Sequence, residues 1–203
     1  MGTYERDGRK YPSVTTILQV IAKPELLGWY GKYGNQECKR MLGAAAEKGT
    51  AVHEAIERWL LGGDDAGWVG PAAAHKDAAM KAISKLELPK EGLQGEVTVY
   101  HDVLQYAGTF DLMYTDRDGK RVLLDWKSGK RLYPEFALPL AAYATAWEFG
   151  GGGKVDRMVC VRVGEGGEFD IEEHDGKDDL FEVFKAALTL YRWKNPIKEE
   201  SNG

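Results

Sequence analysis

Three acidic side chains and one lysine fall in three short segments that all have the pattern of β-strands. Asp125 and Lys127 share one segment, Asp111 lies in the segment before it, and Glu96 lies in the segment before that. Residues two apart on a strand point to the same face, so Asp125 and Lys127 project together and Trp126 points away. Buried charges are costly unless they are paired. A divalent metal ion is a suitable partner for clustered carboxylates, and a lysine beside it can contact an anion or a water.

The turn between the second and third segments decides whether Asp111 can meet Asp125. A three-residue loop over residues 117–119, with Gly119 in the left-handed conformation, sets the two aspartates opposite each other. A two-residue loop would set Asp111 opposite Trp126 and scramble both faces of the sheet. The hydrophobic pattern favours the three-residue loop, because that register gathers one nearly continuous apolar face: Phe110, Leu112, Tyr114, Val122, Leu124 and Trp126.

The preceding hairpin leads to the same face. A four-residue loop over residues 102–105 pairs Glu96 with Asp111, and opposed side chains on neighbouring strands lie about 5 Å apart at Cβ. We therefore predict that Glu96, Asp111 and Asp125 form an acidic row across three strands, with Lys127 at its end. The alternative is a solvated outer sheet face that carries incidental charges.

A helix upstream contributes a histidine. The apolar residues of this segment recur at helical spacing and form one stripe: Val52, Ala55, Ile56, Trp59 and Leu60. His53 and Glu57 are one turn apart on the edge of that stripe, where side chains can reach a cleft between the helix and the elements it covers. The alternative is a surface His–Glu pair. The segment lacks the second histidine of a His-Glu-x-x-His zinc motif, because residue 57 is glutamate.

The sequence predicts one domain over residues 1–203. Residues 1–92 are expected to be mainly helical, residues 93–194 to form a sheet core with flanking helices, and residues 195–203 to be a polar tail. Helices are expected from the cap at Ser13 to Ile21, from Pro24, over 35–61 with a break at Gly49, and over 72–86, 138–149 and 177–193. Strands are expected over 94–101, 106–115, 121–127, 155–163 and 168–173.

Composition restricts the class of protein. The chain has 203 residues and a net charge of −5, which argues against a broad, non-specific grip on nucleic acid. Two cysteines, Cys38 and Cys160, are too few for a disulfide framework or a four-thiolate cluster, so no iron–sulfur cluster is expected. No apolar run is long enough for a membrane span, and the N-terminus lacks the pattern of a signal peptide. We expect a reducing, cytoplasmic location and no membrane partner.

These segments, taken in order, resemble the PD-(D/E)XK nuclease superfamily and its RecB-like branch, which includes phage exonucleases and CRISPR-associated nucleases. The resemblance spans roughly residues 11–149. The matching motifs are Tyr11-Pro12-Ser13-Val14-Thr15-Thr16-Ile17-Leu18, Gly49-Thr50-Ala51-Val52-His53-Glu54 with Glu57, Gly95-Glu96, Ala107-Gly108-Thr109-Phe110-Asp111, Leu124-Asp125-Trp126-Lys127-Ser128-Gly129 and Leu140-Ala141-Ala142-Tyr143.

The resemblance implies a restriction-endonuclease-like core, a mixed α/β fold whose central mixed sheet is flanked by helices and preceded by a helical region. It implies a metal-dependent DNA nuclease, an exonuclease of the phage or recombination and repair type, in a bacterial or phage-infected cell. Mg²⁺ or Mn²⁺ would be held by Asp111, Asp125, Glu96, His53 and the backbone carbonyl of Trp126. Lys127 would position the attacking water or stabilise developing charge, with Glu57 orienting His53.

The resemblance also suggests residues that would touch DNA, as single strands or duplex ends. Lys130 and Arg131 would contact flanking phosphates, and Tyr143 would stack on a base or hold Lys127; the alternative for Tyr143 is packing against the sheet. Pro139 departs from the family, whose members usually carry glutamine there, and we place it in the first turn of its helix.

Two other classes of function remain open at this point. One is a non-catalytic nucleic-acid-binding or protein-interaction module on a nuclease scaffold, and the other is a metallohydrolase with a small substrate. Protein partners and oligomeric state do not follow from the sequence.

Overall fold

A five-stranded mixed sheet forms the centre of the computed structural model, which describes residues 2–22 and 24–196; the end of the expected polar tail, residues 197–203, lies outside these ranges. The strands follow one another across the sheet in chain order: β3 (Gln94–His101), β4 (Tyr106–Thr115), β5 (Arg121–Lys127), β6 (Arg157–Val163) and β7 (Phe169–His174). β5 and β6 are parallel because α4 (Ala137–Phe149) connects them, and the other neighbours are antiparallel.

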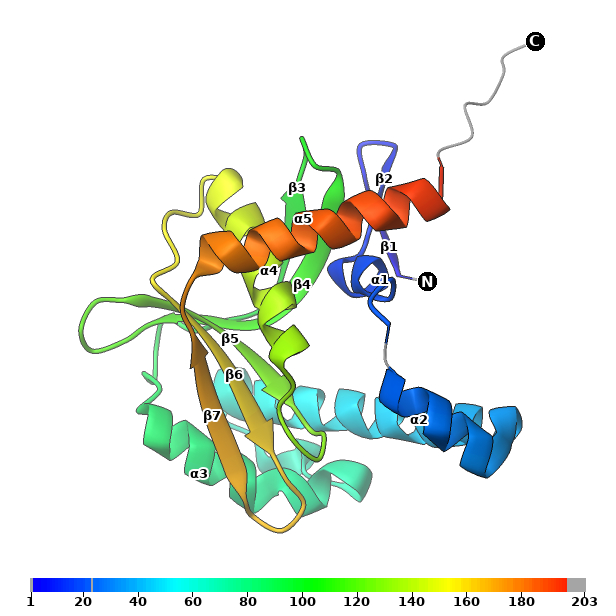
Figure 1. Cartoon of the computed structure of the whole chain (residues 1–203). Coiled ribbons are helices and arrows are strands. Elements are labelled where there is room, and N and C mark those ends of the chain that lie inside the picture. Colours follow the sequence, from blue (N-terminus) through cyan, green and yellow to red (C-terminus); the bar gives the residue numbers. More distant parts are fainter. Residues whose placement is uncertain (1, 23, 197–203) are drawn as a thin grey trace.

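Helices cover both faces of this sheet (Figure 1). α4, α5 (Lys177–Lys194) and α1 (Val14–Leu18) pack on one face around a core that includes Leu140 and Phe184. α3 (Lys76–Leu86) and the second half of α2 (Pro24–Gly62) pack on the other face around Val52, Ala79 and Leu124. Three short 3₁₀ helices, Asp65–Gly67, Gly70–His75 and Pro134–Phe136, complete the described elements. The expected mixed α/β architecture with a central mixed sheet flanked by helices is confirmed.

The predicted strand registers are confirmed at the paired residues, but the ladders of the described sheet contain neither a Glu96–Asp111 nor an Asp111–Asp125 pair. Gly119 has φ 75°, and the Asp116 N–H donates to the Lys120 carbonyl at 2.8 Å, which closes the three-residue loop. Leu112 therefore pairs with Leu124, as the hydrophobic pattern requires. His101 pairs with Tyr106 across the predicted four-residue loop. Both turns bring the end of β4 that carries Asp111 next to β3 and β5.

The expected separation into one apolar and one polar face is wrong. Phe110 packs in the core beneath α4, whereas Leu112 and Trp126 pack in the core beneath α2 and α3. The alternation along β4 therefore breaks between Phe110 and Leu112. On the neighbouring strand Glu96 takes the left-handed conformation, φ 49°, and the ladder passes from Val97–Phe110 to Gly95–Leu112 without a Glu96–Asp111 pair. Both faces are buried, so the alternative of a solvated outer face is wrong as well.

Helix boundaries differ from the predictions at two places. α2 continues through Gly49, and its non-helical residue is Gly34, with φ 75° and ψ 161°. Gly49 is instead a point of close approach, because a Cβ built on it would lie 3.5 Å from the Ser128 hydroxyl oxygen. The helix expected from residue 72 begins at Lys76, after a 3₁₀ turn.

The N-terminal residues form a hairpin that the sequence did not predict. β1 (Thr3–Arg6) and β2 (Arg9–Pro12) are antiparallel and joined at Asp7-Gly8. Ser13 caps α1, as predicted, by accepting the Thr16 N–H at 3.0 Å, although α1 ends at Leu18 and not Ile21. Cys38 and Cys160 are both free and buried.

Candidate active site

Asp111 joins three elements through its two carboxylate oxygens. One oxygen accepts the backbone N–H of Trp126 at 2.6 Å, and the other lies 3.2 Å from Nδ1 of His53 on α2. The backbone ladder between β4 and β5 reaches Leu112–Leu124, so the Asp111 side chain continues the strand pairing one residue further. This aspartate thereby fixes the end of β5 against α2.

Asp125 and Lys127 form a buried ion pair on β5. The Lys127 ammonium donates a hydrogen bond to the carboxylate of Asp125, and Asp125 is 6% exposed. Burial raises the pKa of Asp125, and the like charge of Asp111 raises it further. The opposite charge of Lys127 lowers the Asp125 pKa but does not outweigh these two effects, so the pKa is raised overall. Burial lowers the pKa of Lys127, but the charges of Asp125 and Asp111 outweigh it and raise that pKa overall. The lysine therefore remains charged between two carboxylates.

His53 and Asp111 stabilise each other's charged forms. Burial lowers the pKa of His53, but the hydrogen bond and charge of Asp111 outweigh burial, so the His53 pKa is raised. Burial raises the pKa of Asp111, but His53 and Lys127 outweigh it, so the Asp111 pKa is lowered. The hydrogen bond to Nδ1 of His53 leaves Nε2 as the nitrogen available for another partner.

Glu96 and Glu57 border an open pocket beside this cluster. The pocket has a volume of about 470 Å³ and is lined by residues of α2, including His53, and by Glu96. Burial raises the pKa of Glu96, and the charges of Asp111 and Glu57 raise it further. Such repulsion between neighbouring carboxylates is relieved when a cation binds between them.

Most of the site residues predicted from the sequence lie together, at the junction of α2 with β3, β4 and β5. They are His53, Glu57, Glu96, Asp111, Asp125, Trp126 and Lys127. The His53 partner is Asp111, while the predicted partner Glu57 lines the same pocket. Sequence reasoning missed Tyr4, whose hydroxyl lies 3.0 Å from the Thr109 hydroxyl at the edge of this region. Tyr4 lies in the hairpin that the sequence did not predict.

Tyr143 packs against the sheet. Its residue is 4% exposed, and a Cβ built on Gly108 would lie 2.3 Å from the Tyr143 ring. The predicted role in stacking on a base is therefore wrong, and the packing alternative holds. Burial and the charge of Asp125 raise the Tyr143 pKa well above its usual range. Pro139 lies in the first turn of α4, as predicted.

Lys130 and Arg131 lie beyond the end of β5, away from the carboxylates. The Arg131 guanidinium lies 4.6 Å from the centre of the Tyr133 ring. Lys130 borders a second pocket, together with Ser128 and Lys48. Neither residue extends the acidic cluster.

The donor set suits a hard divalent cation, since carboxylate oxygens with an imidazole nitrogen bind Mg²⁺ or Mn²⁺. Within residues 2–22 and 24–196, no group of three or more His, Cys, Asp or Glu side chains is arranged to hold a metal ion. The Lys127 ammonium is paired with the Asp125 carboxylate, and Asp111 is hydrogen-bonded to His53. The side chains therefore have the donor atoms that such a cation requires, but these atoms are bonded to other protein groups.

Comparisons with known proteins add little at this distance. No family model matches the sequence, and no curated protein matches it. Among solved structures, the chain is similar to a candidate exonuclease from Eubacterium rectale, with 14% identity and a TM-score of 0.45, over 73% of this chain and 65% of that one. It is similar to the protein SSO0001 with 10% identity and a TM-score of 0.36, over 59% of this chain and 60% of that one. The chain spans less than two thirds of the length of either protein. No helix in the described part of the chain is long and apolar enough to cross a membrane.

Proposed function

We propose that the chain is a metal-dependent nuclease that hydrolyses phosphodiester bonds in DNA, as an exonuclease of the phage or recombination and repair type. The observation that carries the proposal is the buried Asp125–Lys127 pair beside the Asp111–His53 pair. Four ionisable groups in a partly buried place are costly to fold, and such groups cluster at functional sites. The order of the surrounding motifs, which resembles PD-(D/E)XK nucleases, supports phosphodiester chemistry.

Each residue has a role in this proposal. Mg²⁺ or Mn²⁺ would be held by Asp111 and Asp125, with Glu96, His53 and the Trp126 carbonyl as further donors, and when bound it lowers the pKa of a water and offsets phosphate charge. Lys127, once released from Asp125, donates to a phosphoryl oxygen or holds the attacking water.

The protein's own contacts prepare the site. Asp111 orients His53 by the hydrogen bond to Nδ1, which fixes the ring and increases the basicity of Nε2. Glu57 adds negative charge next to Glu96 and raises the affinity of the pocket for a cation. DNA, as single strands or duplex ends, is the proposed partner.

A nuclease assay with linear, circular and single-stranded DNA tests the proposal. Purified protein should degrade at least one form with Mn²⁺ or Mg²⁺ and stop when a chelator is added. Asp125→Asn should abolish cleavage, whereas Glu91→Gln, which removes an exposed carboxylate outside the site, should leave it intact. Absence of cleavage of every DNA form with both metals would refute the enzymatic proposal.

A non-catalytic binding module is the second candidate. It is favoured by one specific observation: Lys127 occupies the Asp125 carboxylate that a metal would need. Thermal unfolding with and without Mn²⁺ separates the two candidates, because a ligand that binds only the native state raises its melting temperature. A melting temperature that does not change with Mn²⁺ would support the binding module.

A further inference from the structure

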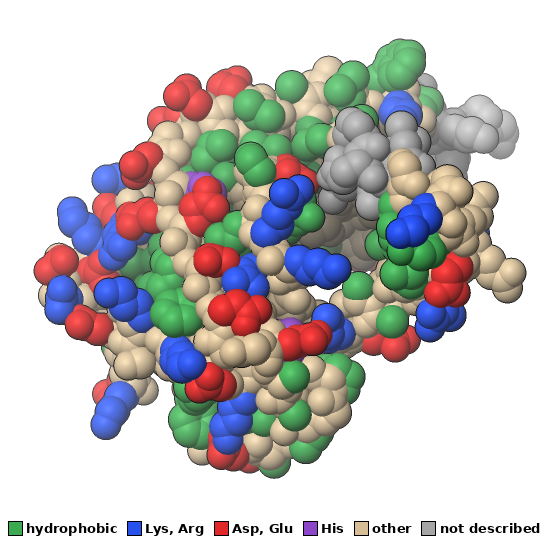
Figure 2. Space-filling model, turned by 60° about the horizontal axis from the view of Figure 1, so that its bottom comes forward, with side chains coloured by type: hydrophobic (Ala, Val, Ile, Leu, Met, Phe, Trp, Pro, Cys, Tyr) green, Lys and Arg blue, Asp and Glu red, His purple; other side chains and the backbone are tan. Residues whose placement is uncertain are grey.

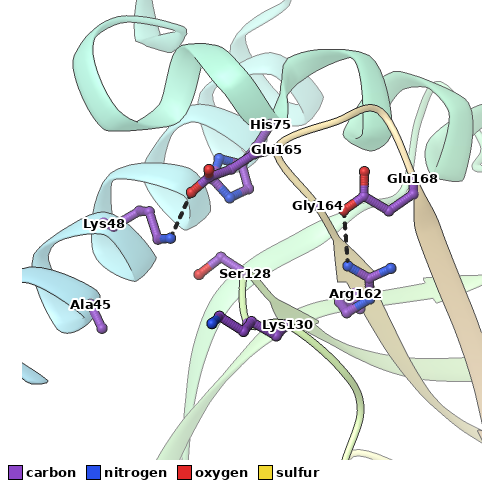
Figure 3. A pocket seen from close by; sticks show the side chains of 10 residues that line it. Ala45, Lys48, His75, Ser128, Lys130, Arg162, Gly164, Glu165 and Glu168 are labelled. Atoms are coloured by element: carbon purple, nitrogen blue, oxygen red, sulfur yellow. Dashed lines mark hydrogen bonds and ion pairs between the residues drawn. The ribbon is translucent and has the colours of Figure 1, made fainter.

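A second pocket, of about 400 Å³, lies beside the end of β5 (Figure 3). Lys48 on α2, Ser128 and Lys130 after β5, and Arg162 at the end of β6 contribute polar side chains to its lining. Figure 3 shows Ser128 between Lys48 and Lys130, with both amines directed into the same space. The pocket therefore presents two ammonium groups and a hydroxyl to a ligand.

Two of the cations in this pocket are paired with carboxylates of the β6–β7 hairpin. Lys48 binds Glu165 at 2.7 Å, and Arg162 binds Glu168 at 3.4 Å (Figure 3). The Lys130 charge is not neutralised by any carboxylate of the described chain. Acidic and basic side chains are interspersed over this side of the molecule, and several Lys and Arg side chains border its hollowed part (Figure 2). Arg162 also binds Asp170, so Lys48 and Lys130 are the cations of the pocket with the most freedom to contact a ligand.

His75 is a buried polar side chain that lines the same pocket. Its residue is 0% exposed, and neither ring nitrogen has a hydrogen-bond partner among the described residues. Burial and the charge of Lys48 lower the His75 pKa, while Glu165 and the Pro71 carbonyl act in the opposite direction. Buried polar groups are rarely left without a partner. His75 therefore places a buried imidazole at the wall of the pocket, where the charges of Lys48 and Glu165 act on it.

We propose that this pocket binds a phosphate group of a nucleic-acid strand, and that the Glu165 carboxylate occupies the place of that phosphate on Lys48 in the free protein. The proposal rests on the proposed nuclease function for the identity of the strand. Lys48, Lys130 and the Ser128 hydroxyl would donate to the phosphate oxygens, which suits a compact anion.

The position of the pocket relative to the candidate active site fits a neighbouring phosphate on one strand. Ser128 follows Lys127 directly, and Gly49 brings α2 within van der Waals contact of Ser128. Lys48 and His53 lie on the same helix, five residues apart, or about 7.5 Å along the helix axis. The basic pocket and the candidate active site are therefore neighbours along α2.

Glu165 is suited to being displaced. It lies between glycines at 164, 166 and 167, and its side chain is 60% exposed. An exposed ion pair is weak, so its rupture reduces affinity for an incoming phosphate by about fivefold at most. Removing the Glu165 charge should therefore strengthen nucleic-acid binding by a factor of that size.

The test measures binding of a fluorescently labelled single-stranded oligonucleotide by anisotropy, with chelator present so that no cleavage occurs. Glu165→Gln should bind about threefold to fivefold more tightly than wild type, and this gain should disappear in a Lys48→Ala background. The Lys130→Ala variant should bind the oligonucleotide more weakly. The slope of the logarithm of its binding constant against the logarithm of salt concentration should fall by about one. Glu91→Gln and Lys90→Ala are the matched controls, because both residues are exposed and outside the pocket.

The outcomes separate this pocket from the rest of the proposed function. Equal effects of Glu165→Gln and Glu91→Gln would show a general charge effect and overturn the proposal. Inorganic phosphate should displace the oligonucleotide at lower concentration than chloride of the same ionic strength, and equal displacement would also overturn it. If the variants behave as expected but the protein cleaves no DNA, the pocket is supported and only the catalytic proposal fails.

Discussion

Replacing Lys127 with methionine tests the buried charge cluster on which the candidate site depends. Methionine keeps most of the side-chain volume and removes the ammonium, so the Asp125 carboxylate loses its ion pair. The Asp125 side chain is 8% exposed and that of Lys127 is 24% exposed, so water can replace little of the lost contact. Removing one partner of a buried pair costs about 3–5 kcal/mol, and the partial exposure of Lys127 places this pair at about 3 kcal/mol.

The companion variants isolate the interaction itself. Asp125→Asn leaves an ammonium that can turn towards Asp111 or solvent, so we expect a smaller loss of about 1–2 kcal/mol. The double variant should be less destabilised than the sum of the two single variants, with a coupling energy of about 2 kcal/mol. A native protein of this size has about 10–15 kcal/mol of stability, so all three variants should fold.

The pH dependence has a definite sign. Without Lys127, burial and Asp111 keep the Asp125 pKa raised in the folded variant. A carboxyl whose pKa is raised on folding binds its proton more tightly in the native state, so stability is regained as pH falls and lost as pH rises through that pKa. The stability difference between wild type and Lys127→Met should therefore shrink between about pH 7 and about pH 4.

Urea unfolding followed by circular dichroism measures these quantities, and thermal unfolding gives a parallel estimate. A loss of 3 kcal/mol corresponds to a fall of about 6–12 °C in melting temperature for a chain of this length. A coupling energy below about 0.5 kcal/mol would show that Lys127 and Asp125 do not form the buried pair. A stability difference that is constant across the pH range would refute the burial argument for Asp125.

Three further substitutions test the surrounding structure. Gly108→Ala should cost about 1–3 kcal/mol in urea unfolding, because its Cβ would lie 2.3 Å from the Tyr143 ring, and the same substitution should cost less in a Tyr143→Ala background; an unchanged midpoint would contradict the contact. Gly49→Ala should stabilise the protein by up to about 1 kcal/mol, because the position is helical and the new contact is ordinary; destabilisation would instead indicate a break in α2. Asp116→Asn should be less stable than wild type at neutral pH: burial raises the Asp116 pKa, but hydrogen bonds from the Lys120 N–H and from Arg157 outweigh it and lower that pKa. A carboxyl pKa that is lowered on folding gives stability that is lost as pH falls through that pKa. The melting temperatures of wild type and Asp116→Asn should therefore converge below about pH 4, and a difference that stays constant with pH would contradict this.

The sheet could be predicted from the sequence because its signals are local. The bounds of β3, β4 and β5 follow from alternating or β-branched residues between turn residues, and the hydrophobic pattern of β4 and β5 selects the three-residue loop, with Gly119 left-handed, that sets Asp111 near Asp125. The registers then follow by counting, since each turn fixes which residues face each other. The opposite directions of Trp126 and Lys127 also follow from the sequence, because consecutive residues of a strand point to opposite faces of the sheet.

The errors arise where tertiary packing decides. Glu96 adopts φ 49°, which no residue pattern around it requires, and Phe110 and Leu112 pack in the cores on opposite faces of the sheet. Gly49 predicts a helix break because of its residue type, but α2 continues through it, and the Ser128 side chain lies next to it. β1 and β2 carry too few apolar residues to show the period of a strand, and their pairing is revealed only by the fold.

Lys127 lies on β5 between the candidate active site and the basic pocket. On β5 its ammonium neutralises Asp125, and the next residue, Ser128, already belongs to the basic pocket. In both places a protein group occupies a position that the proposed reaction assigns to another species: Lys127 takes the place of a cation at Asp125, and Glu165 takes the place of a phosphate at Lys48. A strand that displaces Glu165 would bring negative charge towards Lys127 and weaken its hold on Asp125. Binding of the strand and loading of the metal should therefore favour each other, because a cation at Asp125 frees the Lys127 ammonium for a phosphate, and a phosphate near Lys127 frees Asp125 for a cation.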